Sequence, residues 1–483
     1  GERERRLDDH RDFTEAWKKL MLWDEHTWGA WNSVSDPDLP FVKKQWEIKR
    51  YFALQAHELA AQLKAKLQGS PSPLFYAINP LSYGGQRFLR LANGLADGCL
   101  VTDSVGEVMP GQRIGSDTLV EMSFENGWQT AKLILKPVCQ SGKPQEILFT
   151  GSFQNAFFNV RFDDRSGAIS SLYDRELGAE VLSPGAGLGA LHYVSGGKWR
   201  EPASVHFAEL ICSESGSLCQ RIVFRCGLSG THFVLLEYLF YHRAKRIDLN
   251  VTVSKIAVRL RESLHLEFPF GLEGGVLRYD SAGAPLRPEF DQLPGMCRNF
   301  LSPTSYADVS TSDYGITVAL LDTPLIEVGG LTAEQPWLES LHSETRFFAY
   351  LMNNIWHTNY KADQEGEATF RYSMLFHAGF EPTQVLSEVL AVRTPLQLLD
   401  GKVREPQFPF PPPPLPLVCL ALRYLPEQAA YLLLILNSSD HDAQWRLPGT
   451  KTYVSDPLGT KADECKEILA CKGFQQLWLL VEV

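Results

Sequence analysis

Two neighbouring stretches of sequence decide the fold class: Phe233-Val-Leu-Leu-Glu-Tyr-Leu-Phe240 and Ile247-Asp-Leu-Asn-Val-Thr-Val253. Both are short runs rich in aliphatic, aromatic and β-branched residues, a composition typical of strands. Similar runs, separated by Gly, Asn, Asp and Pro, occur towards the N-terminus at Leu74–Ile78, Thr130–Leu135 and Phe157–Phe162. Because few helical periods interrupt these runs, the pattern predicts antiparallel β-sandwich domains rather than a parallel sheet with crossover helices.

The first 69 residues have a different period. Apolar residues recur every three or four positions across Phe13–Trp31 and again across Ile48–Leu67, with Pro37 and Pro40 between them. This spacing predicts two long amphipathic helices joined by a turn. Pro71 ends the helical region, because proline lacks the amide donor that a helix needs.

The chain has 483 residues, enough for about three domains of roughly 150 residues each. We expect a helical bundle segment at 1–69, a small β domain at 70–145, a large β-sandwich domain at 146–400 and a C-terminal β domain at 401–483. A helix is expected at Pro382–Ala391, after Glu381. The run Pro409–Pro416 reads as a stiff connector before the last domain.

Composition excludes several classes of function. The net charge of −11 argues against nucleic acid as a partner, and no apolar stretch is long enough to span a membrane. The nine cysteines contain no CxxC pair, which excludes a zinc finger and favours a reducing compartment, hence the cytoplasm. The chain opens Gly-Glu-Arg-Glu-Arg-Arg with no initiator Met, so we expect further sequence upstream.

A first candidate site lies in Trp23–Asn32, which combines Asp24, Glu25 and His26 with three tryptophans. The acids and the imidazole could bind a metal ion, and indole rings suit the apolar face of a sugar. The alternative is a helix-bundle core with packed tryptophans and an exposed acidic edge. Against that alternative, Asp24 shares a helical stripe with tryptophans, and a carboxylate on an apolar face is costly unless it is paired or bound to a metal.

A second candidate site is a loop between strands that could read sugar hydroxyl groups with amides and stack a sugar on aromatic rings. Its candidate substrate-binding residues are Asn353, Asn354, Trp356, His357, Asn359 and Tyr360. The alternative is a turn whose Asn side chains bond their own backbone. A third cluster, Arg278–Asp280 with Arg287–Glu289 and Gln292–Gly295, is interpreted as a structural loop. No GxSxG, HExxH, P-loop or dinucleotide motif is present.

Several short motifs follow one another in a fixed order along the chain. They are Asp24–Ala30, Asn155–Phe158, Gly167–Asp174, Gln292–Gly295, Tyr306–Ser310, Asp313–Gly315, Pro324–Gly330 and Asn353–Tyr360. In this order they resemble the glycoside hydrolase family 38 α-mannosidases, from about residue 15 to about residue 400. The specificity of the resemblance comes from the order, since each motif alone is weak.

The resemblance implies a fold with an N-terminal β/α barrel, a three-helix segment and then β-sandwich domains. The sandwiches are expected to be of the supersandwich, galactose-mutarotase-like type. This chain would begin after the barrel. The nucleophile and the barrel's zinc ligands have no counterpart in it, so no catalytic residue is assigned.

The resemblance also implies retaining hydrolysis of α-mannosides with a bound zinc ion. Aligned on Gly29, Asp24 falls at the family's ligand His and Glu25 at its Asp, while His26 is the imidazole at hand. The metal role therefore stays open between His26 and Asp24, and Glu25 is assigned to substrate binding. Zinc is expected in the full enzyme, and no cofactor is required by this chain alone.

We therefore expect the middle and C-terminal part of an α-mannosidase-like hydrolase, inactive without its barrel. Its expected partners are an α-mannoside or related glycan and the missing barrel. An apolar patch on the helical segment is expected to favour a homo-oligomer. The alternative is a non-enzymatic carbohydrate-binding or scaffold protein. A sandwich lyase acting on acidic polysaccharide is disfavoured by the net charge.

Overall fold

The computed structural model of the chain describes residues 2–25, 29, 31–67, 73–92, 99–137, 144–342, 344–354, 360–401, 405–447 and 451–482. The fold is mainly β with an N-terminal helical segment, as the sequence predicts. In these ranges every pair of neighbouring strands runs antiparallel, for example β16 with β17 and β27 with β28. No helix of the described part is long and apolar enough to cross a membrane.

The helical segment is a hairpin of α1 (Glu2–Asp24) and α2 (Pro40–Leu67). The helices run antiparallel, because Lys66 near the end of α2 contacts Asp9 and Asp12 near the start of α1, at 2.9 and 2.8 Å. Proline at the first position of α2 is favourable, since the amide there would have no helical partner. The prediction of two helices joined by a turn is confirmed. In the described residues, the segment that was expected to form a helical bundle contains these two helices.

A large sandwich forms the centre of the molecule. Its ten-stranded sheet comprises, in spatial order, β20 (Ala284–Leu286), β19 (Val276–Ser281), β21 (Tyr306–Ser310), β22 (Gly315–Leu320), β25 (Gly366–His377), β17 (Arg246–Lys255), β16 (Thr231–Tyr241), β15 (Cys219–Gly227), β14 (Phe207–Ser215) and β7 (Gln145–Glu146). Its five-stranded sheet comprises β13 (Ala203–Ser204), β12 (Leu191–Ser195), β18 (Glu262–Pro269), β24 (Arg346–Asn353) and β23 (Ile326–Val328).

Alternate residues of these strands build one hydrophobic core between the two sheets. Leu236 and Tyr238 of β16 enter it from the ten-stranded sheet, and both are fully buried. Phe268 of β18 and Phe347 of β24 enter it from the other sheet, with their rings stacked at a centroid distance of 4.9 Å. Side chains at every second position share a face of a strand, so the residues between them point away from this core.

Smaller sheets surround the sandwich. The first comprises β11 (Ala179–Glu180), β10 (Ile169–Asp174), β9 (Phe158–Phe162) and β8 (Ser152–Gln154). The small β region contains β26 (Gln397–Asp400), β1 (Leu74–Ile78), β6 (Thr130–Pro137) and β3 (Cys99–Thr102), with a second sheet of β2 (Gly85–Leu91), β5 (Asp117–Phe124) and β4 (Gly111–Ile114). The C-terminal sheets are β27 (Leu417–Leu425), β28 (Ala430–Asn437), β33 (Gln476–Glu482), β30 (Thr452–Ser455) and β31 (Lys461–Glu464), and β29 (Ala443–Arg446) with β32 (Ile468–Cys471).

The helix α3 (Pro382–Arg393) follows β25, where the sequence predicts a helix. The Glu381 carboxylate accepts hydrogen bonds from the amides of Thr383 and Gln384, which caps the helix. After α3 the chain returns to the small β region, because β26 pairs with β1. The domain boundaries expected from the sequence stay a prediction.

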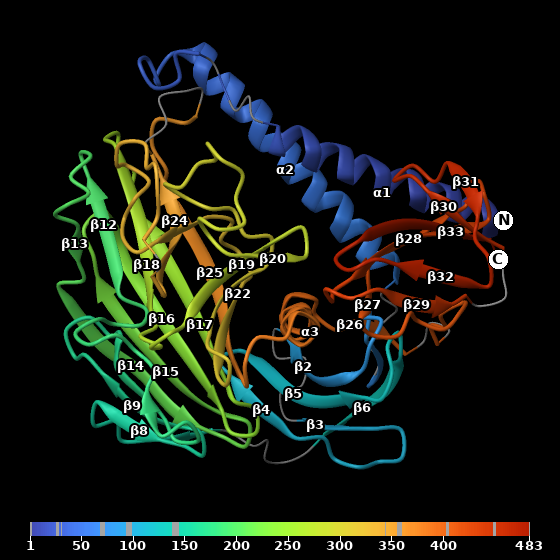
Figure 1. Cartoon of the computed structure of the whole chain (residues 1–483), viewed down its shortest axis with the longest axis horizontal. Helices are drawn as coiled ribbons and strands as arrows, with labels where there is room; N and C mark the ends of the chain where they lie inside the picture. Colours follow the sequence, from blue (N-terminus) through green and yellow to red (C-terminus); the bar gives the residue numbers. More distant parts are fainter. Residues whose placement is uncertain are drawn as a thin grey trace.

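Figure 1 shows how these parts are arranged. The helical hairpin crosses the molecule with its turn beside one end of the sandwich and its open end beside the C-terminal sheets. An exposed contact at 3.4 Å between Arg423 of β27 and His10 of α1 marks that second junction. The fold therefore places the helical turn, which carries the first candidate site, at the edge of the sandwich.

Candidate functional site

The turn between the two helices lies against the loop that follows β24. The Ser33 hydroxyl of the turn donates a hydrogen bond to the backbone oxygen of Tyr360, 327 positions away, at 2.7 Å. Arg259, between β17 and β18, donates to Asp38 of the turn at 2.6 Å and to Asp363 of the loop at 2.8 Å. The two candidate sites of the sequence analysis thus lie on segments that contact each other (Figure 1).

Opposite charges hold this junction together. Hydrogen bonds from Arg259 and Lys43 keep the pKa of Asp38 well below its usual range. Burial raises the pKa of Asp363, but the hydrogen bond from Arg259 and the charge of Lys361 outweigh it, so the net shift is downward. Both carboxyl groups are therefore ionised at neutral pH. A general acid needs a raised pKa, so these two acids suit an ion cluster rather than proton donation.

The Asn354 side chain stabilises the loop by hydrogen bonds to backbone groups. Its Nδ2 donates to the backbone oxygens of Val258, Leu260 and Ala362 at 3.1, 3.3 and 2.6 Å. Two of the three acceptors belong to the segment between β17 and β18, so the Asn354 side chain joins two loops and does not only bond its own turn. A role for Asn354 in sugar binding stays a prediction.

The other candidates of this loop are placed only in part. Asn353 is the last residue of β24, and Tyr360 is half-buried beside Ser33. Trp356, His357 and Asn359 lie outside the described residues. The substrate-binding roles of Asn353 and Tyr360 therefore stay predictions.

The first candidate site lies at the C-terminal end of α1. Asp24 is the last residue of α1, and its side chain is exposed. Glu25 follows it, and its Oε2 lies 3.5 Å from the ammonium group of Lys49 on α2. Lys49 is buried and donates to the backbone oxygens of Leu22 and Glu25 at 2.7 and 3.0 Å. His26 lies outside the described residues.

The alternative interpretation, a bundle core with packed tryptophans, is wrong for Trp31 of this segment and for Trp17, which precedes the segment on α1. Trp17 is 54% exposed and Trp31 is 87% exposed. On α1, the stripe that Asp24 shares with Trp17 is therefore exposed at the surface. Asp24 carries no burial cost there, so its position alone does not require a metal ion.

Lys49 is expected to fix the end of α1. Replacing Lys49 with Met keeps most of the side-chain volume but leaves the carbonyls of Leu22 and Glu25 without their charged donor. We expect the free energy of unfolding to fall by about 1–3 kcal/mol, measured by urea unfolding. Lys44→Met changes an exposed lysine of the same helix and serves as the control. Equal stability of the two variants would contradict the capping role.

The described residues offer no cluster of three or more His, Cys, Asp or Glu side chains arranged for a metal ion. Every cysteine in the described ranges is a free thiol. Burial raises the pKa of Cys219, Cys226 and Cys419 to about 12, so these thiols stay protonated and are poor ligands and nucleophiles at neutral pH.

The contacts of the third cluster agree with its interpretation as a structural loop. The buried Asp280 carboxylate accepts hydrogen bonds from the amides of Ser305 and Tyr306 at 2.7 and 2.8 Å. Arg287 pairs with Asp291 on the surface at 3.0 Å. These contacts fix the turns around β19 and β20.

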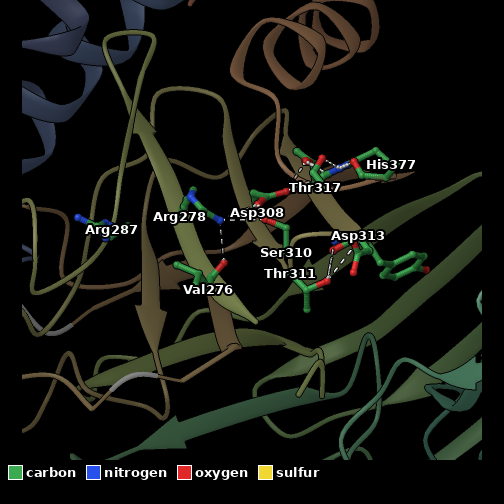
Figure 2. Close-up of polar contacts among 12 residues, drawn as sticks. Val276, Arg278, Arg287, Asp308, Ser310, Thr311, Asp313, Thr317 and His377 are labelled. Atoms are coloured by element: carbon green, nitrogen blue, oxygen red, sulfur yellow. Dashed lines mark hydrogen bonds and ion pairs between the residues drawn. The ribbon is translucent and has the colours of Figure 1, made fainter. Parts of the chain in front are cut away.

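A neighbouring group of polar side chains converges inside the ten-stranded sheet (Figure 2). Asp308 of β21, fully buried, accepts hydrogen bonds from Ser310 at 2.6 Å and from Thr317 at 2.8 Å. Its Oδ2 also lies 3.0 Å from Nε2 of His377, at the end of β25. Arg278 donates to Ser310 at 2.9 Å from the adjacent strand.

The surroundings of His377 favour its protonated form. Its Nδ1 lies 2.9 Å from the backbone oxygen of Gly379, so both ring nitrogens face acceptors. Burial lowers its pKa, but the hydrogen bond to Asp308 and that carboxylate's charge outweigh burial, and the net shift is upward. Sequence reasoning assigned neither residue to a site. The available signal was a charged residue within an otherwise apolar strand.

Some solved protein structures have a fold similar to that of this chain. No family model and no curated protein sequence matches the chain. Among solved structures, the chain is similar to an α-mannosidase from Enterococcus faecalis V583, with a TM-score of 0.69 and 13% identity, covering 98% of this chain and 64% of that one. It is also similar to a glycosyl hydrolase family 38 protein from Enterococcus faecalis, with a TM-score of 0.65 and 13% identity, covering 98% and 66%.

These similarities confirm, at the level of the fold, the resemblance inferred from the motifs. Nearly the whole chain superposes on each protein, yet it spans less than two thirds of their length. The fold is therefore that of a portion of these larger proteins.

Proposed function

We propose that this chain is the middle and C-terminal part of an α-mannosidase-like glycoside hydrolase. It would act with a catalytic domain that supplies the nucleophile, and it would be inactive without that domain. Structural similarity over 98% of the chain to an α-mannosidase whose length it covers to 64% supports the proposal. The expected substrate is an α-mannoside or a related glycan.

Exposed apolar side chains on both helices of the hairpin add support to the proposal. On α1, Phe13, Trp17 and Met21 recur at helical spacing and are 42, 54 and 70% exposed. On α2, Phe41 and Tyr51 are 57 and 58% exposed. Exposed apolar surface of this kind marks an interaction site. We assign it to contact with the catalytic domain.

The catalytic chemistry is not complete in the described residues. Retaining hydrolysis uses two carboxyl groups about 5–5.5 Å apart, one as nucleophile and one as acid. At the helical turn, Glu25 contacts Lys49, and the acids Asp38 and Asp363 are paired with Arg259. All three carboxyl groups are held by a neighbouring cation, so we assign none of them as nucleophile or acid. The turn and the loop beside it would instead form one wall of the sugar site.

The side chains at the same turn show how well this chain alone could bind a zinc ion. Asp24 is one carboxylate, and Glu25 lies beside the positive charge of Lys49, which opposes a second positive ion. This donor set does not hold zinc by itself. In the full enzyme, this chain would contribute His26 or Asp24 to a zinc ion. The remaining zinc ligands would come from residues outside the described ranges.

The proposal is tested by sequencing the transcript upstream of the codon for Gly1. We expect an open frame of several hundred residues that alternates strand and helix patterns and carries a His-x-Asp motif near its start. A start codon directly before Gly1 would contradict the proposal. It would favour the alternative of a non-enzymatic carbohydrate-binding or scaffold protein.

The apolar hairpin surface also predicts self-association of the 483-residue chain. Sedimentation velocity should show dimers that increase with protein concentration. The variant Trp17→Glu with Met21→Glu should shift the equilibrium to monomer, because it places charge on exposed apolar positions without disturbing a core. Leu148→Glu, which changes a residue that is 89% exposed far from the hairpin in sequence, is the control. A monomeric wild-type chain at high concentration would contradict this prediction.

A further inference from the structure

A second polar site lies on the outer face of the five-stranded sheet. A cavity of about 1150 Å³ opens there, with Glu267 of β18, His192 of β12 and Arg346 of β24 in its lining. We propose that this cavity binds a neutral polyhydroxylated ligand, a saccharide, separately from the proposed mannoside site. The inference does not depend on the proposed function.

Glu267 is the anchor of the cavity. Its side chain is 3% exposed, and its Oε2 lies 2.8 Å from Nε2 of His192. Its Oε1 lies 2.6 Å from Nη2 of Arg346, an ion-pair contact without hydrogen-bond geometry. A buried carboxylate is tolerated only when it is paired in this way. The three strands thus place an acceptor and two donor groups at one point of the cavity.

The two partners of Glu267 line the cavity and have hydrogen-bonding groups that Glu267 does not use. The side chain of Arg346 is 39% exposed and that of His192 is 19% exposed. A guanidinium carries five N–H donors, more than the contact with Glu267 uses. Unused donors beside a carboxylate are suited to hydroxyl groups, which both donate and accept.

Phe348 holds this polar group in a fixed arrangement. The guanidinium of Arg346 lies 5.0 Å from the Phe348 ring centroid, and the His192 ring meets Phe348 edge-on at 5.5 Å. Phe348 itself is 2% exposed, so it cannot rotate away without opening the sheet face. Preorganised groups bind a ligand at a smaller entropic cost than mobile ones.

The rest of the lining favours a neutral ligand. The charged residues are of both signs, with three acids against two arginines, namely Asp163, Glu267, Glu344, Arg165 and Arg346. An anionic ligand would meet the acids, and a cationic ligand would meet the arginines. The cavity is open at Gly185 and Gly274, because a Cβ added to either glycine would meet no atom within 4 Å.

The cavity is distinct from the helical turn. Arg346 and Asn353 are the first and last residues of β24, so about 23 Å of strand separates them at roughly 3.3 Å per residue. Ligand binding at one place can therefore be blocked without touching the other.

The test is saturation-transfer NMR of the 483-residue chain with D-mannose, D-galactose and D-glucose as neutral probes and D-glucuronate as an anionic one. We expect at least one neutral sugar to bind and glucuronate not to compete. Ser204→Trp, an exposed substitution at the cavity's edge on β13, should abolish the signal by filling the space. Glu267→Gln should weaken binding by about tenfold or more, because the sugar loses a charged acceptor.

Glu209→Gln, an exposed acid on β14, is the matched control and should bind as the wild type does. Thermal unfolding verifies that each variant is folded, and Ser204→Trp decides alone if Glu267→Gln does not fold. Absence of binding by every neutral sugar would overturn the inference, as would preferential binding of glucuronate. Binding that survives either substitution in a folded protein would also overturn it, because Glu267 would then serve only to join the strands.

Discussion

Asp308→Asn is expected to lower the free energy of unfolding by about 3–5 kcal/mol near pH 6. The substitution keeps the shape of the side chain but removes the charge that faces His377. Both residues are buried, and their side chains are 0 and 1% exposed. A protonated imidazole without its carboxylate is an uncompensated buried charge. The folded state therefore either loses stability by retaining this charge or loses the proton of His377. Urea unfolding of the two proteins measures the loss.

The pH dependence of this effect has a definite sign. The folded pKa of His377 is raised above its ordinary value of 6.5 by Asp308. A raised pKa in the folded state stabilises the protein fully below pH 6.5, and this contribution disappears as the pH rises through the folded pKa. The stability difference between wild type and Asp308→Asn should therefore shrink from pH 6 to pH 9.

Asp313→Asn provides the matched control for this pair. Asp313 lies on the exposed turn between β21 and β22 and is labelled in Figure 2. Its substitution should change stability by less than about 0.5 kcal/mol. A loss for Asp308→Asn no larger than that of the control, or a difference that grows with pH, would contradict the buried ion pair.

Phe347→Ala is expected to cost about 3–5 kcal/mol, because it removes a fully buried ring from the centre of the sandwich. The ring stacks on Phe268 at 4.9 Å and lies 6.2 Å from Phe270, so few neighbours can move in to fill the space. Chemical unfolding measures the loss. Phe207→Ala is the control, since Phe207 is 48% exposed on β14.

A loss below about 1 kcal/mol for Phe347→Ala would mean that the two sheets do not share a close-packed core. The position of the helical turn depends on this core, since Arg259 lies between two strands of different sheets. The packing of the sandwich thus determines where the candidate sugar site is held.

Local features of the sequence predicted the elements well. Glu381 and Pro382 mark the start of α3 because a cap and a first-turn proline are local interactions. The strands around Phe233–Phe240 and Ile247–Val253 follow from composition and spacing alone, which is enough when each strand has an apolar face.

Contacts between distant segments were beyond such reasoning. Nothing near Ser33 in the sequence indicates Tyr360, and nothing near Asp38 indicates Arg259, since only the folded sandwich brings them together. The exposure of Trp17 was also hidden, because an apolar helical stripe looks the same whether it packs on its own chain or on another domain.

The cavity on the five-stranded sheet did leave a signal in the sequence. In Glu262-Ser-Leu-His-Leu-Glu-Phe-Pro269 the apolar residues alternate with Ser263, His265 and Glu267. Polar residues at every second position predict a polar face, and buried polar residues need partners. The identity of those partners, His192 and Arg346, required the pairing of β18 with β12 and β24.

The most direct test of the central claim is hydrolysis of 4-nitrophenyl α-mannoside. The 483-residue chain should release no 4-nitrophenol above the uncatalysed rate, with or without added zinc. The polypeptide extended upstream of Gly1 should hydrolyse the substrate with retention of anomeric configuration. Turnover by the 483-residue chain alone, or a folded extended polypeptide that does not cleave the substrate, would contradict the assignment of this chain as the non-catalytic part of an α-mannosidase-like enzyme.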